Sequence, residues 1–132
     1  KFGNLFWDDI RLGKHTVPVG IIGDVVLARK DTPTSYHLSA TLDDHIQRIG
    51  LVTRGEDLVN ATHVHKILQV LLGLKSPKYL HHPLILDSNG VRLSKRTRAQ
   101  TIKSLKASGL KREDVIDLFG KENILNLLSL IK

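Results

Sequence analysis

Cysteine and methionine are absent from this chain of 132 residues, and aromatic residues make up only 5% of it. The absence of cysteine excludes disulfide bonds and thiolate metal sites. No apolar run approaches the roughly 20 residues that a membrane-spanning helix needs. The first ten residues lack the continuous apolar stretch of a secretory signal peptide. These absences lead us to expect a soluble, cytoplasmic protein without a membrane partner, of the size of one ordinary domain.

Positive charge is concentrated towards the carboxyl end of the chain. The formal net charge is +7, and residues 92–132 hold ten of the 20 Lys and Arg residues but only four of the 13 Asp and Glu residues. A local excess of cations favours a polyanionic partner, such as a nucleic acid or the phosphates of a nucleotide. A solvated basic surface is the alternative that charge alone leaves open.

The spacing of apolar residues predicts alternating strands and helices. Three runs, at residues 20–30, 51–54 and 81–87, are rich in β-branched and other apolar residues and are typical of strands. Apolar residues at steps of three and four predict helices over 35–50 and 62–73. This alternation indicates an α/β fold with a parallel sheet. The last forty residues are predicted to be helical, in segments 99–109, 111–120 and 121–131.

The second of these helices is predicted in more detail. Asn60 or Thr62 can cap its amino end through a side-chain oxygen. Its apolar residues at helical spacing are expected to face the core, and these are Ile67, Val70, Leu71 and Leu74.

Polar residues follow two of the predicted strands, where ligands of parallel sheets bind. Arg54 ends the strand at 51–54, and the cationic loop VRLSKR, residues 91–96, follows the strand at 81–87. A candidate site therefore lies at this end of the sheet.

Three blocks of sequence resemble the second half of the catalytic domain of class I aminoacyl-tRNA synthetases of the glutamyl type. They are GDVVLARKDTPTSYHLSATLDD, LVTRGEDLVNATHVHKILQVLLGL and HHPLILDSNGVRLSKR, in the order that the family has them. The last block resembles the strand that leads into the family's KMSKS loop. The resemblance implies a Rossmann-type half-domain over residues 1–90, followed by the loop and a small helical tail over 91–132. Phrases such as TRGEDL, ATHVHKILQ and YLHHPLI resemble the branch of the family that transfers glutamate to queuosine of tRNA(Asp).

The resemblance gives the cationic loop a role in ATP chemistry. Negative charge builds up on the phosphates as pyrophosphate leaves, and a mobile cationic loop can stabilise it. Lys95 matches the second lysine of KMSKS and is the expected catalytic residue. The expected ATP-binding loop comprises Arg92, Leu93, Ser94, Lys95 and Arg96.

The resemblance also places Tyr36 and Arg54 at the positions that hold the glutamate substrate. An arginine pairs with a carboxylate through two parallel hydrogen bonds, and a tyrosine hydroxyl can add another donor. Asp57 matches the family's RGxD motif and is a secondary candidate. From the residues alone, a tyrosine at the position of Tyr36 more often serves packing, and an arginine after a strand, such as Arg54, more often forms a surface ion pair.

We expect no metal ion to be held by these residues. His63 and His65 are two residues apart, which separates them on a helix. The resemblance implies ATP as the cofactor, with Mg²⁺ bound to it, and places any zinc site in the family's amino-terminal half.

No HxGH signature of the family's first half occurs in this chain. We therefore expect the chain to be inactive alone, to need that amino-terminal half as a partner, and to self-associate through an exposed sheet edge. The complete enzyme would use glutamate, ATP and tRNA, with tRNA(Asp) favoured. Two alternatives stay open: a fragment of a conventional glutamyl-tRNA synthetase and a non-catalytic tRNA-binding module.

Overall fold

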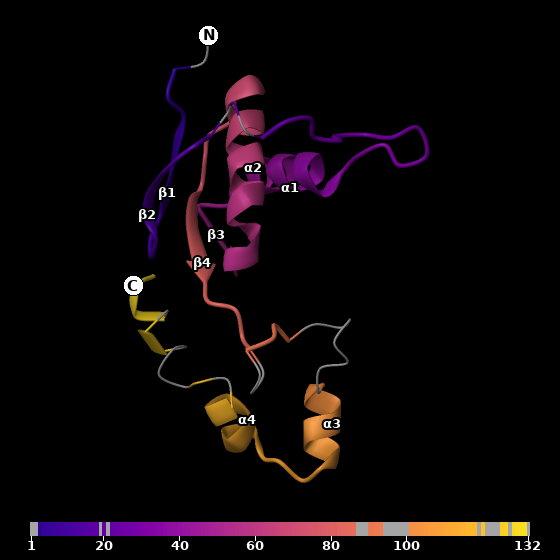
Figure 1. The fold of residues 1–132 in the computed structure, drawn as a ribbon, viewed down its shortest axis with the longest axis vertical. Helices are drawn as coiled ribbons and strands as arrows, with labels where there is room; N and C mark the ends of the chain where they lie inside the picture. The colour runs from indigo at the N-terminus through magenta and orange to yellow at the C-terminus, as the bar shows by residue number, and fades with distance from the viewer. Residues whose placement is uncertain are drawn as a thin grey trace. The chain divides into compact units, whose positions relative to one another are not determined.

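The computed structural model separates the chain into two compact units, residues 1–82 and 83–132 (Figure 1). Each unit is described by itself. The structure describes residues 3–18, 20, 22–86, 90–93, 101–118, 120, 125–126 and 128–131.

The first unit is built on a four-stranded sheet with the order β2-β1-β4-β3. Its strands are β1 (Phe6–Asp9), β2 (Gly13–Thr16), β3 (Leu51–Gly55) and β4 (Lys78–His82). Strands β3 and β4 pair in parallel along their whole length, and β1 joins the other side of β4 in parallel. The hairpin partner β2 is antiparallel to β1. Among the described residues β3 pairs on one side only, so its outer edge is open.

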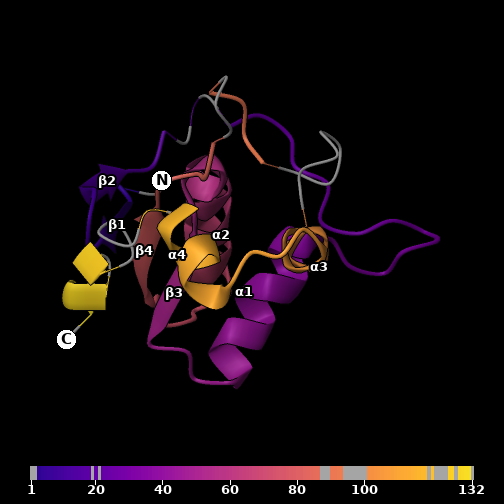
Figure 2. The same cartoon turned by 90° about the horizontal axis from the view of Figure 1, so that it is seen from below.

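Two helices complete this unit, α1 (Tyr36–Ile46) and α2 (Val59–Leu71), with a short 3-10 turn η1 (Glu56–Leu58) before α2. The Ser35 hydroxyl caps α1 by accepting a hydrogen bond from the Leu38 backbone N–H. Helix α2 packs against the sheet, and α1 packs beside α2 (Figure 2). The α/β class with a parallel sheet is thus confirmed.

One carboxylate ties β1 to β4. These strands share a single register pair, Asp9 opposite Tyr79. The Asp9 side chain adds to it by accepting hydrogen bonds from the backbone N–H and the ring Nδ1 of His81, at 2.9 and 2.6 Å. Its other oxygen accepts from the backbone N–H groups of Arg11 and Leu12, both at 2.8 Å, and so closes the β1–β2 turn. Burial raises the pKa of Asp9, but these hydrogen bonds outweigh burial and hold the pKa below its ordinary value.

The layer between the sheet and α2 is largely polar. Trp7 and Tyr79 are its large aromatic residues, 2% and 0% exposed. Hydrogen bonds join α2 to the strands across this layer: Thr62 to His81, His63 to Trp7, His65 to Arg54, and Gln69 to Tyr79. Because a buried polar group that loses its partner is costly, this interface fixes the placement of α2 more specifically than apolar packing would.

The strand predicted at 20–30 is wrong for the described residues of that run. Residues 22–30 pair with no strand of the sheet, and the chain turns back on itself instead. The backbone N–H of Ser35 donates to Leu27 O and that of Arg29 to Thr32 O, both at 2.8 Å. β-Branched composition indicates a capacity for extended backbone, but a strand also needs a neighbouring ladder.

The strand predicted at 81–87 lies earlier in the chain, at Lys78–His82. Pro83 has no backbone N–H to give to a ladder, so the strand ends immediately before it. Leu86, beyond the proline, instead forms an isolated antiparallel bridge with Arg92.

The details predicted for α2 are confirmed only for Ile67, which packs against the buried cluster around Trp7 and Tyr79. The helix starts at Val59, after η1, and Leu58 at its cap position makes no side-chain capping bond. Val70 and Leu71 are 36% and 57% exposed rather than buried. The residues that face inward are mainly polar, and they are Thr62, His63, His65, Leu68 and Gln69.

The described part of the second unit contains two short helices, α3 (Ile102–Ala107) and α4 (Arg112–Leu118). Thr101 caps α3, and Gly109 follows it with φ of 90°, a left-handed conformation that glycine adopts readily. Both helices lie within predicted segments. The helix predicted at 121–131 falls partly outside the described residues.

The Asp9 network predicts the effect of one substitution. Asp9→Asn removes the charge that accepts four hydrogen bonds, so the free energy of unfolding should fall by roughly 3 kcal/mol or more. Asp8→Asn is the matched control, because Asp8 is the exposed neighbour on the same strand, and it should change stability by no more than about 0.5 kcal/mol. Urea denaturation followed by tryptophan fluorescence measures both; equal losses would contradict the role given to Asp9.

Candidate functional site

Arg54 is a buried cation near the carboxyl end of β3. Arg54 is 7% exposed, and its guanidinium carbon lies 5.0 Å from the centre of the Tyr79 ring. Its Nη1 and Nη2 atoms lie 3.4 and 3.3 Å from Nδ1 of His65. Within the described part of the chain, Nε of Arg54 has no hydrogen-bond partner and no carboxylate forms an ion pair with the guanidinium. A buried arginine in this state has free capacity for a carboxylate ligand.

His65 links Arg54 to Tyr36. The His65 residue is 1% exposed, and its Nε2 lies 3.2 Å from Nδ1 of His37. The Tyr36 ring centre lies 5.4 Å from that of His65, and Tyr36 is 52% exposed. The structure therefore brings both predicted glutamate-binding residues to one imidazole, with Arg54 on its inner side and Tyr36 at the surface.

The pKa values of three groups near Arg54, namely His65, Tyr79 and Asp44, are shifted from their ordinary values. Burial, together with the charges of Arg54 and His37, lowers the pKa of His65 to about 3. Burial also raises the pKa of Tyr79. Burial raises the pKa of Asp44 on α1, although the charge of Arg54 opposes this rise. The imidazole and the phenol beside Arg54 are therefore both neutral at pH 7 and do not cancel the charge of its guanidinium.

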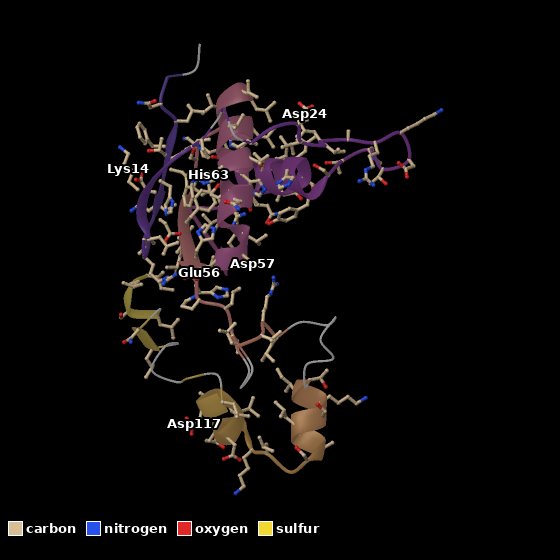
Figure 3. The ribbon with its side chains drawn as sticks, viewed as in Figure 1. Lys14, Asp24, Glu56, Asp57, His63 and Asp117 are labelled. Atoms are coloured by element: carbon tan, nitrogen blue, oxygen red, sulfur yellow. The ribbon has the colours of Figure 1, made fainter. Side chains whose placement is uncertain are left out.

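The other predicted residue of this unit, Asp57, lies at the carboxyl end of β3. Asp57 and Glu56 belong to η1, which follows β3 directly (Figure 3). Glu56 forms an ion pair with Arg11, which itself donates from Nε to the His81 carbonyl. Polar groups therefore gather at the end of the sheet where parallel-sheet ligands bind.

Two residues of the predicted ATP-binding loop are described, Arg92 and Leu93, in the second unit. The backbone N–H of Leu93 donates to Ile85 O at 3.0 Å, and Arg92 bridges to Leu86. Gly90 between these arms has φ of 75°, which favours glycine at this turn. Ser94, Lys95 and Arg96 lie outside the described residues, so their roles stay predictions.

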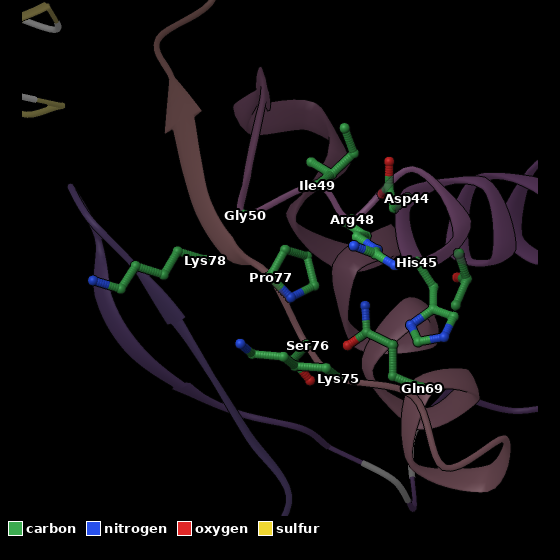
Figure 4. Close-up of a pocket in the computed structure, with 11 residues that line it drawn as sticks. Asp44, His45, Arg48, Ile49, Gly50, Gln69, Lys75, Ser76, Pro77 and Lys78 are labelled. Atoms are coloured by element: carbon green, nitrogen blue, oxygen red, sulfur yellow. The ribbon is translucent and has the colours of Figure 1, made fainter.

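The cavities that described residues of the first unit line include a larger and a smaller one. The larger, about 500 Å³, lies near the amino ends of β3 and β4, because Gly50 and Lys78 line it (Figure 4). Ligands of parallel sheets bind at the opposite ends of the strands, so this cavity is a poor candidate for the nucleotide site. The smaller, about 260 Å³, lies beneath the loop that precedes α1 and includes Tyr36 in its lining.

Reasoning from the sequence missed the participation of His65 and His37. The signal was present in α2, where Thr62, His65 and Gln69 recur at steps of three and four and so share one face of the helix. A search for apolar residues overlooks such a polar stripe.

Comparison with known proteins identifies the class. The model of the family described as tRNA synthetases class I (E and Q), catalytic domain, matches residues 3–124. The chain therefore belongs to this family, as its sequence blocks predicted. It is 47% identical over 114 residues to a Glutamyl-Q tRNA(Asp) synthetase from Rhodobacter capsulatus, covering 86% of this chain and 40% of that protein.

Further relatives include conventional ligases and a solved structure. A Glutamate--tRNA ligase from Chlamydia felis is 31% identical, over 98% of this chain and 27% of that protein. The crystal structure of the glutamate-tRNA synthetase from Elizabethkingia anophelis is similar with a TM-score of 0.63 and 30% identity, over 82% of this chain and 21% of that one. The chain thus spans less than half the length of each of these relatives.

Two structural findings bear on metals and membranes. The described residues contain no group of three or more His, Cys, Asp or Glu side chains arranged to hold a metal ion. Likewise, none of the described helices combines the length and apolarity that crossing a bilayer requires.

The buried histidines predict a pH-dependent stability. Burial lowers the pKa of His63 and of His65, so both are neutral when folded, whereas in the unfolded chain they titrate near the ordinary 6.5. The contribution of the two histidines to the free energy of unfolding is fully present above about pH 6.5. It is lost as the pH falls towards their pKa values in the folded protein, by at most about 1.4 kcal/mol per pH unit for each histidine.

Urea denaturation between pH 7.5 and 4.5 tests this expectation. The free energy of unfolding should decrease continuously towards low pH, and His65→Asn should make that decrease shallower because one titrating group is gone. A stability that is constant or rises as the pH falls from 7 to 5 would contradict it.

Proposed function

We propose that this chain supplies the second half of a catalytic domain that activates glutamate with ATP and transfers it to tRNA. The observation that carries the proposal is Arg54, a buried cation with unused hydrogen-bonding capacity in a family of glutamate- and glutamine-activating enzymes. Arg54 would bind a carboxylate of glutamate, and Tyr36 would cover the substrate from the surface side. Asp57 would lie near the nucleotide at the carboxyl end of β3.

The proposed chemistry is an adenylation followed by a transfer. The α-carboxylate of glutamate attacks the α-phosphorus of ATP, an O–P bond forms, and the bond to the β-phosphate breaks to release pyrophosphate. Lys95, with Arg92 and Arg96, would stabilise the negative charge that develops during this step. An acceptor hydroxyl of tRNA then attacks the glutamyl carbonyl and releases AMP. Mg²⁺ would be held by the ATP phosphates, since the described residues offer no metal site of their own.

We further propose that the acceptor is queuosine of tRNA(Asp) and that the reaction takes place in the cytoplasm. The support for the acceptor is the higher identity to Glutamyl-Q tRNA(Asp) synthetases, at 40–47%, than to the ligase from Chlamydia felis, at 31%. The basic residues 92–132 would contact tRNA phosphates. The alternative acceptor is the terminal ribose of tRNA(Glu), as in a conventional glutamyl-tRNA synthetase.

Glutamate-dependent exchange between ATP and pyrophosphate tests the proposal. The chain alone should be inactive, and the chain extended at its amino end by the rest of the catalytic domain should exchange without tRNA. Lys95→Ala should lower kcat by about a hundredfold or more, while Lys30→Ala, at an exposed position on the loop before α1, should leave exchange unchanged.

The same assay separates the alternatives. Exchange that requires tRNA(Glu) would support the conventional synthetase instead. Binding of tRNA without exchange, in the extended protein and with either tRNA, would support a non-catalytic module and refute the proposed activity.

A further inference from the structure

The partner of Arg54 is a neutral base rather than an acid. Both terminal nitrogens of its guanidinium point to a single acceptor, His65 Nδ1, at 3.3 and 3.4 Å. A buried arginine normally meets a carboxylate, which satisfies its donors and cancels its charge. The contact with His65 gives the two terminal nitrogens of Arg54 a shared acceptor, but it does not neutralise the positive charge of the guanidinium.

A second histidine fixes the state of the first. Neutral His65 carries one ring proton, and because Nδ1 faces the guanidinium, that proton belongs on Nε2. Nε2 lies 3.2 Å from His37 Nδ1, which can accept it. The Thr41 hydroxyl donates to the His37 carbonyl at 2.8 Å, which helps to hold this first turn of α1. In this arrangement Arg54 donates to Nδ1 of His65, and Nε2 of His65 donates to Nδ1 of His37.

We propose that His65, oriented by His37, is a positioning residue that fixes the Arg54 guanidinium while leaving its charge available to the carboxylate of the amino-acid substrate. This inference rests on the proposed function, because it assumes that Arg54 binds glutamate. An aspartate in place of His65 would hold Arg54 equally well but would compete with the substrate for its charge. The role of His65 thus depends on its being an uncharged acceptor.

The charged and titratable groups around Arg54 are consistent with this role. Asp44 of α1 and His81 of β4 lie near enough to sense its charge, and His65 of α2 contacts it directly. From the sheet, Tyr79 lies beneath it. Asp44 makes no hydrogen bond to Arg54 among the described residues, so the contact with His65 decides where the guanidinium points.

Substitutions at His65 in the extended protein test the inference through the KM for glutamate in the exchange assay. His65→Asp should raise this KM by at least about tenfold, because its carboxylate pairs with Arg54. His65→Asn should stay within about threefold of the unsubstituted protein, because its amide oxygen restores a neutral acceptor close to the Nδ1 position. The KM for ATP should change by less than about twofold in both variants, which a general loss of structure would not produce.

His45→Asp is the matched control, since it introduces the same charge at an exposed histidine of α1. It should leave the KM for glutamate unchanged. Thermal melting of each variant reports on folding. Should His65→Asp fail to fold, His37→Leu provides the decisive measurement, because it removes the acceptor for Nε2 and should raise the KM for glutamate by about threefold or more.

The outcomes distinguish this inference from the proposed function. No glutamate-dependent exchange in the unsubstituted extended protein, with or without tRNA, would refute the function itself. Exchange with an unchanged KM for glutamate in folded His65→Asp, or in His37→Leu, would overturn the role of His65 and leave the function standing.

Discussion

The fold of the first unit depends on the carboxylate of Asp9. Strands β1 and β4 share one register pair, and the Asp9 side chain provides the further hydrogen bonds that the short ladder lacks. The same side chain closes the turn into β2. The buried charge of Asp9, together with the hydrogen bonds from Ile10 N–H to Tyr79 O and from Arg11 Nε to His81 O, therefore determines where the β1–β2 hairpin joins the parallel pair β3–β4. Four donors around one carboxylate make its burial tolerable, since a buried charge needs a hydrogen-bond partner for each lone pair.

His81 connects the hydrogen bonds of Asp9 to helix α2. With Nδ1 held by Asp9, the His81 ring presents Nε2 to the Thr62 hydroxyl at 3.0 Å. The bonds from His63 to Trp7 and from Gln69 to Tyr79 continue along the same helix. A polar interface of this kind has few alternative arrangements, because a shifted helix would leave several buried groups unpaired. The contact of His65 with Arg54 thus belongs to a layer whose register is already determined.

The sequence predicted the class of fold and the existence of both long helices, because apolar spacing and the resemblance to synthetases agree there. It could not predict which face of α2 is buried, since that face is polar and hydropathy favoured Val70 and Leu71 instead. The strand at 20–30 was misjudged because composition does not reveal whether a neighbouring strand is present. For the site, the resemblance singled out Arg54 and Tyr36, but their shared contact with His65 depends on how α1, α2 and β3 pack together, which no local pattern encodes.

The polar core and the candidate site follow from the same energetic argument. A buried guanidinium without a carboxylate is costly, and the surrounding structure must keep it from relaxing towards water or towards a nearby acid. Apolar packing alone would give Arg54 no defined orientation, whereas a hydrogen-bonded layer anchored at Asp9 fixes the acceptor that faces it. Natural proteins accept such local instability where a ligand completes the missing interaction. The hydrogen-bonded network anchored at Asp9 thus holds His65 in place, and the proposed binding of a substrate carboxylate by Arg54 would require such a fixed, neutral partner.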